Sequence, residues 1–154
     1  GFAAAVRVAR AVREALRSEG RKAFVKTSGK SGLHVLTAWT GQGGHDEARA
    51  WALEVATRVA DALPEGATVE IRKAKRQGRV YIDVMQNARG HHAVPPYVIR
   101  AVPGATVSTP LCWSELRAGL DPAAFTTEAV LRRIAAQARD PFAPLVRGWT
   151  RADG

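Results

Sequence analysis

The chain has 154 residues and a net charge of +9, from 23 Lys and Arg against 14 Asp and Glu. This length suits one domain with its own core, and no apolar run reaches the roughly 18–20 residues of a membrane-spanning helix. The positive charge favours polyanionic partners, nucleic acid before an acidic membrane surface.

Residues 2–18 are predicted to form the first helix. Apolar residues recur there at three- and four-residue steps, and arginines occupy the other side. Gly20 ends the helix. The arginine row is interpreted as a solvated face, with a DNA-facing stripe as the alternative.

A polar turn separates two predicted strands, residues 22–27 and 33–39. It reads Ser28-Gly29-Lys30-Ser31-Gly32, and His34 lies on the strand that leaves it. Glycines let the main chain approach a ligand and leave N–H groups available to an anion. The sequence therefore predicts a phosphate cradle for a nucleoside triphosphate, although turns of this composition also occur with water alone.

A second helix is predicted over residues 45–63, with acidic groups in its first turn. Residues 68–77 are ambiguous between strand and short helix, and a short helix is favoured. The densest basic cluster of the chain consists of Arg72, Lys73, Lys75, Arg76 and Arg79. It is either an exposed charged turn or a contact for nucleic acid or phosphate.

Residues 79–85 alternate as the clearest strand of the chain. Asp83 stands among its apolar residues, where a carboxylate is costly to bury unless it is paired or binds a metal. It is interpreted either as a paired or water-facing residue or as a hard ligand for Mg²⁺ or Mn²⁺.

Another strand is predicted at residues 97–101, where Arg100 again places a charge among apolar neighbours. The single cysteine, Cys112, excludes an internal disulfide, fits a reducing cytoplasm and is expected in the core. A helix capped by Thr126 is predicted to run to about residue 138. A turn or short helix at 140–145 and a loose tail at 148–154 complete the chain.

Three segments together resemble one family. The turn and strand at 26–35, the strand at 78–87 and the segment at 96–111 are similar to those of archaeo-eukaryotic primase-type polymerases. The branch that they resemble is the polymerase domain of bacterial ATP-dependent DNA ligase D, which works in non-homologous end joining. The resemblance runs over residues 1–147.

The resemblance implies roles for the predicted site. Ser28, His34 and Arg100, with Lys30 as a neighbour, would bind the triphosphate of the incoming nucleotide, and Asp83 would be a catalytic carboxylate that binds Mn²⁺ or Mg²⁺. The basic cluster, together with Gln86, would touch DNA or phosphate.

Two departures from the family pattern accompany the resemblance. Val102 stands where a second arginine is common, and the chain contains no Asp-x-Asp, the motif that supplies the other metal-binding carboxylates. The chain is therefore expected to be the C-terminal portion of a polymerase domain (1–147). It is expected to bind a triphosphate weakly and to be inactive alone.

The expected fold is α/β (α+β), a mostly antiparallel sheet that carries the turn, Asp83 and Arg100, with flanking helices. The expected partners are DNA ends, a nucleoside triphosphate, a ligase domain and an end-binding Ku-like protein, in the bacterial cytoplasm at the nucleoid and with no membrane. A non-catalytic nucleotide or nucleic-acid binding module, or the primase of a mobile element, remain alternatives.

Overall fold

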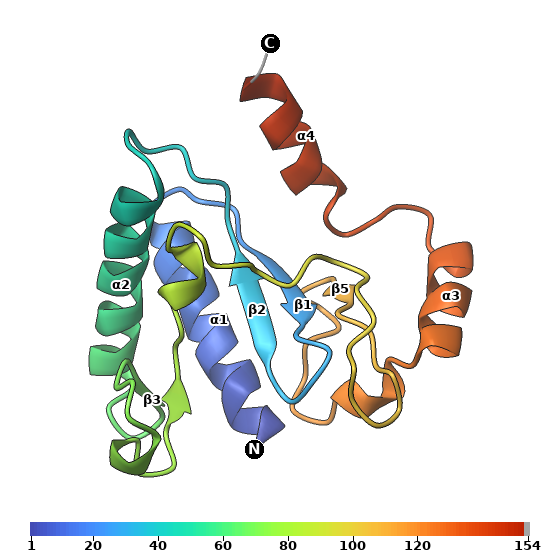
Figure 1. The fold of residues 1–154 in the computed structure, drawn as a ribbon, viewed down its shortest axis with the longest axis horizontal. Helices are drawn as coiled ribbons and strands as arrows, with labels where there is room; N and C mark the ends of the chain where they lie inside the picture. The colour runs from blue at the N-terminus through green and yellow to red at the C-terminus, as the bar shows by residue number, and fades with distance from the viewer. Residues whose placement is uncertain (153–154) are drawn as a thin grey trace.

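The structure, a computed structural model, describes residues 1–152 of the chain (Figure 1). The helices are α1 (Phe2–Ser18), α2 (His45–Ala62), α3 (Thr127–Ala136) and α4 (Ala143–Ala152), with short 3-10 turns at η1 (Lys73–Lys75), η2 (Met85–Asn87) and η3 (Pro122–Ala124). The strands are β1 (Phe24–Thr27), β2 (Leu33–Leu36), β3 (Ala67–Thr68), β4 (Val80–Tyr81) and β5 (Pro110–Leu111). No helix within residues 1–152 has both the length and the apolar character needed to cross a membrane.

Helix α1 lies between a β-sheet and helix α2 (Figure 1). Its apolar residues form two faces. Val6 and Ala9 join Val25 of β1 in one buried cluster, whereas Val8 packs with Val59 of α2 in another. Burial on both sides makes α1 the centre of the core.

Within residues 1–152 the strands form two sheets, one antiparallel and one parallel. The first has the order β2-β1-β5, and in it Lys26 lies directly opposite His34. The second consists of β3 and β4, which pair in parallel. The predicted mixed α/β fold with an antiparallel sheet is confirmed, but the strand before Asp83 belongs to the second sheet.

The two faces of β1 have different neighbours, because successive side chains of a strand point to opposite sides. Val25 faces α1, while Phe24 packs edge-on against Phe142, with ring centroids 5.8 Å apart, in a cluster that includes Leu145 of α4. Lys26 shares the face of Phe24. Lys26, and His34 opposite it on β2, therefore lie on the sheet face away from α1.

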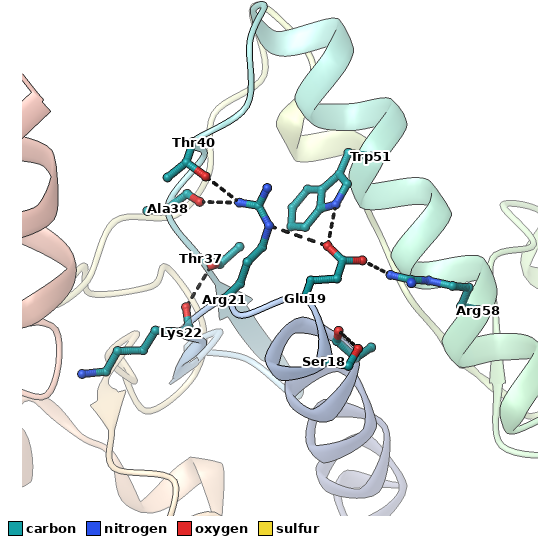
Figure 2. A network of polar contacts seen from close by, with 10 residues as sticks. Ser18, Glu19, Arg21, Lys22, Thr37, Ala38, Thr40, Trp51 and Arg58 are labelled. Atoms are coloured by element: carbon teal, nitrogen blue, oxygen red, sulfur yellow. Dashed lines mark hydrogen bonds and ion pairs between the residues drawn. The ribbon is translucent and has the colours of Figure 1, made fainter.

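The open end of the β1–β2 hairpin is fixed by a polar network (Figure 2). Arg21 donates to Ala38 O and Thr40 Oγ1, both at 3.2 Å, and its guanidinium lies 4.3 Å from the ring centroid of Trp51. Glu19 accepts from Trp51 Nε1 at 3.0 Å and pairs with Arg58 of α2. These contacts hold the hairpin against both helices at the end opposite its turn.

Several predicted elements are shorter or differ in the structure. The strand predicted at 79–85 reduces to β4, and the one at 97–101 reduces to a single bridge between Ile99 and Val107. Residues 148–152, predicted as a loose tail, continue helix α4, and 153–154 lie outside the described residues. Cys112 is exposed and not in the core.

Candidate phosphate-binding site

The turn between β1 and β2 is closed by its own backbone and by one hydroxyl. Ser28 N donates to Gly32 O at 2.9 Å. Ser28 Oγ accepts from the backbone N–H groups of Lys30 and Gly32, each at 3.1 Å. Both bonds use the lone pairs of the hydroxyl oxygen, so its proton remains available to a further acceptor such as a phosphate oxygen.

Arg100 lies across this turn although it is remote in sequence. Its Nη1 donates to Ser28 O at 2.9 Å, and Thr106 Oγ1 donates to Gly29 O at 2.7 Å. Gly29 has φ +73°, and a Cβ there would lie 2.4 Å from Arg100 Cγ. Glycine is therefore required both by the backbone conformation and by the approach of the arginine.

A buried lysine lies beneath the turn. Lys26 has a relative exposure of only 1%, and its Nζ is 2.8 Å from His34 Nδ1 and 2.5 Å from Ser108 Oγ. Ser108 Oγ in turn donates to Thr27 O at 2.7 Å. Strand register explains the pair, since Lys26 and His34 are directly opposite on β1 and β2.

Burial first, and neighbouring positive charge second, shift the pKa values of this group. Burial, and then the charge of Arg100, lowers the pKa of Lys26 to about 8. Burial, and then the charges of Lys26 and Arg100, lowers the pKa of His34 to about 4. The two cations, Lys26 and Arg100, favour a polyanionic ligand, which would relieve their mutual repulsion.

Asp83 is exposed and lies two residues beyond the end of β4, so the predicted strand ends before it and its carboxylate faces water. Its Oδ1 accepts from Met85 N at 2.9 Å. Its charge opposes the lowering of the His34 pKa, so the carboxylate lies within electrostatic reach of the turn. Among residues 1–152 no three His, Cys, Asp or Glu side chains group as metal ligands. Asp83 by itself would offer a metal ion a single carboxylate.

The basic cluster divides into two kinds of residue. The guanidinium of Arg76 donates to Glu70 O at 2.9 Å and to Ile71 O at 2.7 Å, and it covers the ring of Tyr81 at 3.9 Å. Arg79 Nε donates to Arg76 O at 3.0 Å. The exposed members are Arg72, Lys73 and Lys75, and Gln86 is exposed in η2.

Sequence reasoning missed Lys26, Ser108 and Thr106 as members of this site. For Lys26 a signal was present, because a tight turn centred on Lys30 places residues 26 and 34 opposite each other on adjacent strands. Ser108 and Thr106 carried no comparable signal, since a long-range contact brings their segment to the turn.

Fold and site together define an α/β domain whose antiparallel hairpin carries a polar turn beside positively charged side chains. A family model described as "LigD, primase-polymerase domain" matches residues 1–142, and the chain belongs to this family. The chain is 37% identical over 130 residues to the multifunctional non-homologous end joining DNA repair protein LigD of Mycobacterium tuberculosis H37Rv, covering 83% of the chain and 17% of that protein. It is 31% identical over 137 residues to the bifunctional LigD of Bacillus subtilis, covering 88% of the chain and 22% of that protein.

A solved structure agrees with the sequence comparisons. The polymerase domain of Mycobacterium tuberculosis ligase D, determined in complex with DNA, superposes with a TM-score of 0.86 and 34% sequence identity. The match covers 94% of this chain and 50% of that one. The chain therefore spans about half of the solved polymerase domain and about a fifth of each LigD protein compared.

Proposed function

We propose that this chain is the triphosphate-binding portion of a nucleotidyltransferase that adds nucleotides, including ribonucleotides, to DNA ends in bacterial non-homologous end joining. The observation that carries the proposal is the bond from Arg100 to Ser28 O, which places a guanidinium over the glycine turn beside the Lys26–His34 pair. Membership of the LigD primase-polymerase family supports the reaction class.

Each side chain of the turn has a distinct role in this proposal. Ser28 donates its hydroxyl proton to a phosphate oxygen, and His34 donates from its outer ring nitrogen. Lys30, exposed at the tip of the turn, and Arg100 supply positive charge and N–H donors. Charge-assisted hydrogen bonds of this kind are about twice as strong as neutral ones.

Asp83 fits a divalent ion only in part. Mg²⁺ and Mn²⁺ take oxygen ligands, and Mg²⁺ is often held by one or two carboxylates together with substrate phosphates. Asp83 would give one such ligand, and the triphosphate and water would give the others. When bound, the ion neutralises phosphate charge. Because the chain has no Asp-x-Asp, we expect it to bind nucleotide without polymerising by itself.

DNA is the proposed second substrate. The solved relative was determined with DNA, and this chain exposes Arg72, Lys73 and Lys75 on one short segment. Phosphate contacts of this type give binding that is independent of sequence and weakens with salt. A ligase domain and an end-binding Ku-like protein, at the bacterial nucleoid, are the partners proposed for the whole protein.

A non-catalytic nucleotide-binding module is the second candidate, and one observation favours it. The preorganised contacts surround the turn, whereas Asp83 is exposed and belongs to no group of three or more potential metal ligands within residues 1–152. Such a module would bind the triphosphate and leave chemistry to another chain.

Primer extension tests the proposal. The 154-residue chain is incubated with a DNA end bearing a 3′ overhang, ATP and Mn²⁺, and nucleotide addition and ATP binding are measured in the same preparation. We expect ATP to bind and the primer to remain unextended. Robust extension would overturn the expected inactivity of the chain alone, and absence of ATP binding would overturn the triphosphate site.

A further inference from the structure

We propose that Lys26 is a positioning residue that holds His34 as the neutral tautomer with its proton on Nε2. This proposal rests on the function proposed above only for the identity of the bound anion, a nucleoside triphosphate. The tautomer itself depends only on the hydrogen bonds among Lys26, His34, Ser108 and Thr27.

The direction of each hydrogen bond is determined by two groups, a carbonyl oxygen that can only accept and an ammonium that can only donate. The carbonyl oxygen of Thr27 only accepts, so the hydroxyl of Ser108, 2.7 Å away, donates to it. Ser108 Oγ therefore accepts from Lys26 Nζ at 2.5 Å. A lysine ammonium has no lone pair, so His34 Nδ1, 2.8 Å from the same nitrogen, must accept as well. The proton of the neutral imidazole is then on Nε2.

The charges around the pair agree with this assignment. A pKa of about 8 keeps Lys26 mostly charged at pH 7, and a pKa of about 4 keeps His34 neutral. The charged groups that act on His34 are Lys26 and Arg100, which lower its pKa, and Asp83, which opposes them. Arg100 also acts on Lys26. Protonation of both nitrogens of His34 would place a second cation against a buried ammonium.

The consequence for ligand binding is preorganisation. An imidazole free to exchange tautomers would face a phosphate with a lone pair for part of the time. Lys26 removes that alternative and fixes the ring plane through Nδ1, in the way that a partner on one ring nitrogen fixes the tautomer of other functional histidines. Lys26 itself is 1% exposed, so it acts through His34 and not as an exposed phosphate ligand.

Long-range ¹⁵N–¹H spectra of the histidine-labelled chain test the tautomer without any ligand. The His34 signal is identified by its loss in His34→Gln. We expect the unmodified chain to show the neutral Nε2–H form of His34 from pH 7 down to pH 5, where Lys26 is mostly charged. A proton on Nδ1, or rapid exchange between the two tautomers, would overturn the proposal whatever the chain binds.

Two variants then test whether Lys26 positions the imidazole of His34. Lys26→Met should raise the pKa of His34 and allow exchange between its two tautomers. Ser108→Ala leaves the lysine in place and should increase the population of the Nδ1–H tautomer to a smaller degree. ATP binding to Lys26→Met should weaken by about twofold from tautomer exchange alone, because only about half of the molecules would then present an N–H group to the phosphate. Lys22→Met, which removes an exposed lysine outside the cluster, is the matched control and should change neither readout.

The outcomes distinguish the two proposals. A fixed Nε2–H tautomer in a chain that does not bind ATP would uphold the role of Lys26 and overturn the triphosphate function. An unchanged His34 tautomer in both Lys26→Met and Ser108→Ala would overturn the role of Lys26 even if ATP binds. If Lys26→Met fails to fold, the spectra of the unmodified chain and of Ser108→Ala still test the role of Lys26.

Discussion

The polar turn at 28–32 and the basic segment at 72–79 are both rich in positive charge, but the structure uses that charge differently. Around the turn, Arg100, Thr106 and Ser108 come from a distant segment and bond to the turn and to β1. In the basic segment, Arg76 and Arg79 bond to carbonyls of their own neighbourhood. Long-range bonds fix the conformation of the turn, whereas local bonds shape the basic segment and leave its lysines exposed.

Gly29→Ala should break the turn most severely. The substitution places a Cβ 2.4 Å from Arg100 Cγ in a residue with φ +73°. We expect a loss of about 3 kcal/mol of stability, from left-handed backbone and overpacking together, and loss of ATP binding. Gly78→Ala is the control, because φ is +77° there and no atom lies within 4 Å of the added Cβ. It should cost about 1 kcal/mol and leave ATP binding intact. Urea unfolding and ATP titration measure both, and equal effects of the two variants would refute the comparison.

Arg100→Met should weaken ATP binding by about 10- to 100-fold, because a charged donor to phosphate and the bond to Ser28 O are both lost. Arg72→Met, in the exposed basic segment, should change ATP affinity less than about twofold, within the usual range for surface substitutions. Titration of each variant with ATP provides the measurement. A similar loss in the two variants would mean that general charge attracts the nucleotide.

Stability should fall as the pH decreases from about 6.5 toward 4, in part because of His34. Its folded pKa of about 4 lies below its ordinary value of 6.5, so the unfolded chain binds more protons in that interval and folding becomes less favourable. Urea unfolding at several pH values should show a shallower dependence in His34→Gln than in the unmodified chain. His91→Asn, in an exposed loop, should retain the full dependence. An unchanged slope in His34→Gln would contradict the burial of a neutral imidazole in the site.

Arg76→Ala should have the smallest of these effects, about 1–2 kcal/mol of stability, because it removes bonds to two carbonyls and a cation–π contact with Tyr81. Lys73→Ala, from an exposed position of the same segment, should stay within about 0.5 kcal/mol. Thermal unfolding compares the two variants. If Lys73→Ala were as destabilising as Arg76→Ala, the local role assigned to Arg76 would be wrong.

The sequence predicted those parts of the fold that depend on local periodicity. The helix expected at 2–18 is α1, and the hairpin around Ser28 forms as expected, because apolar spacing and turn residues determine both. The two-residue pairing of β3 with β4 was not predicted, since so short a parallel contact leaves no periodic signal. For the site, the turn residues were identified from composition, whereas Ser108 reaches Lys26 only through tertiary contacts.

The central claim is that this chain contains a preformed site for the phosphates of a nucleotide. The most direct measurement is a competition experiment in which inorganic tripolyphosphate, AMP and adenosine each displace a fluorescent ATP analogue from the chain in Mn²⁺. We predict that tripolyphosphate competes about as well as ATP, that AMP competes weakly and that adenosine does not compete. Displacement by adenosine but not by tripolyphosphate would contradict the claim, because recognition would then lie in the base and sugar and not in the turn at 28–32.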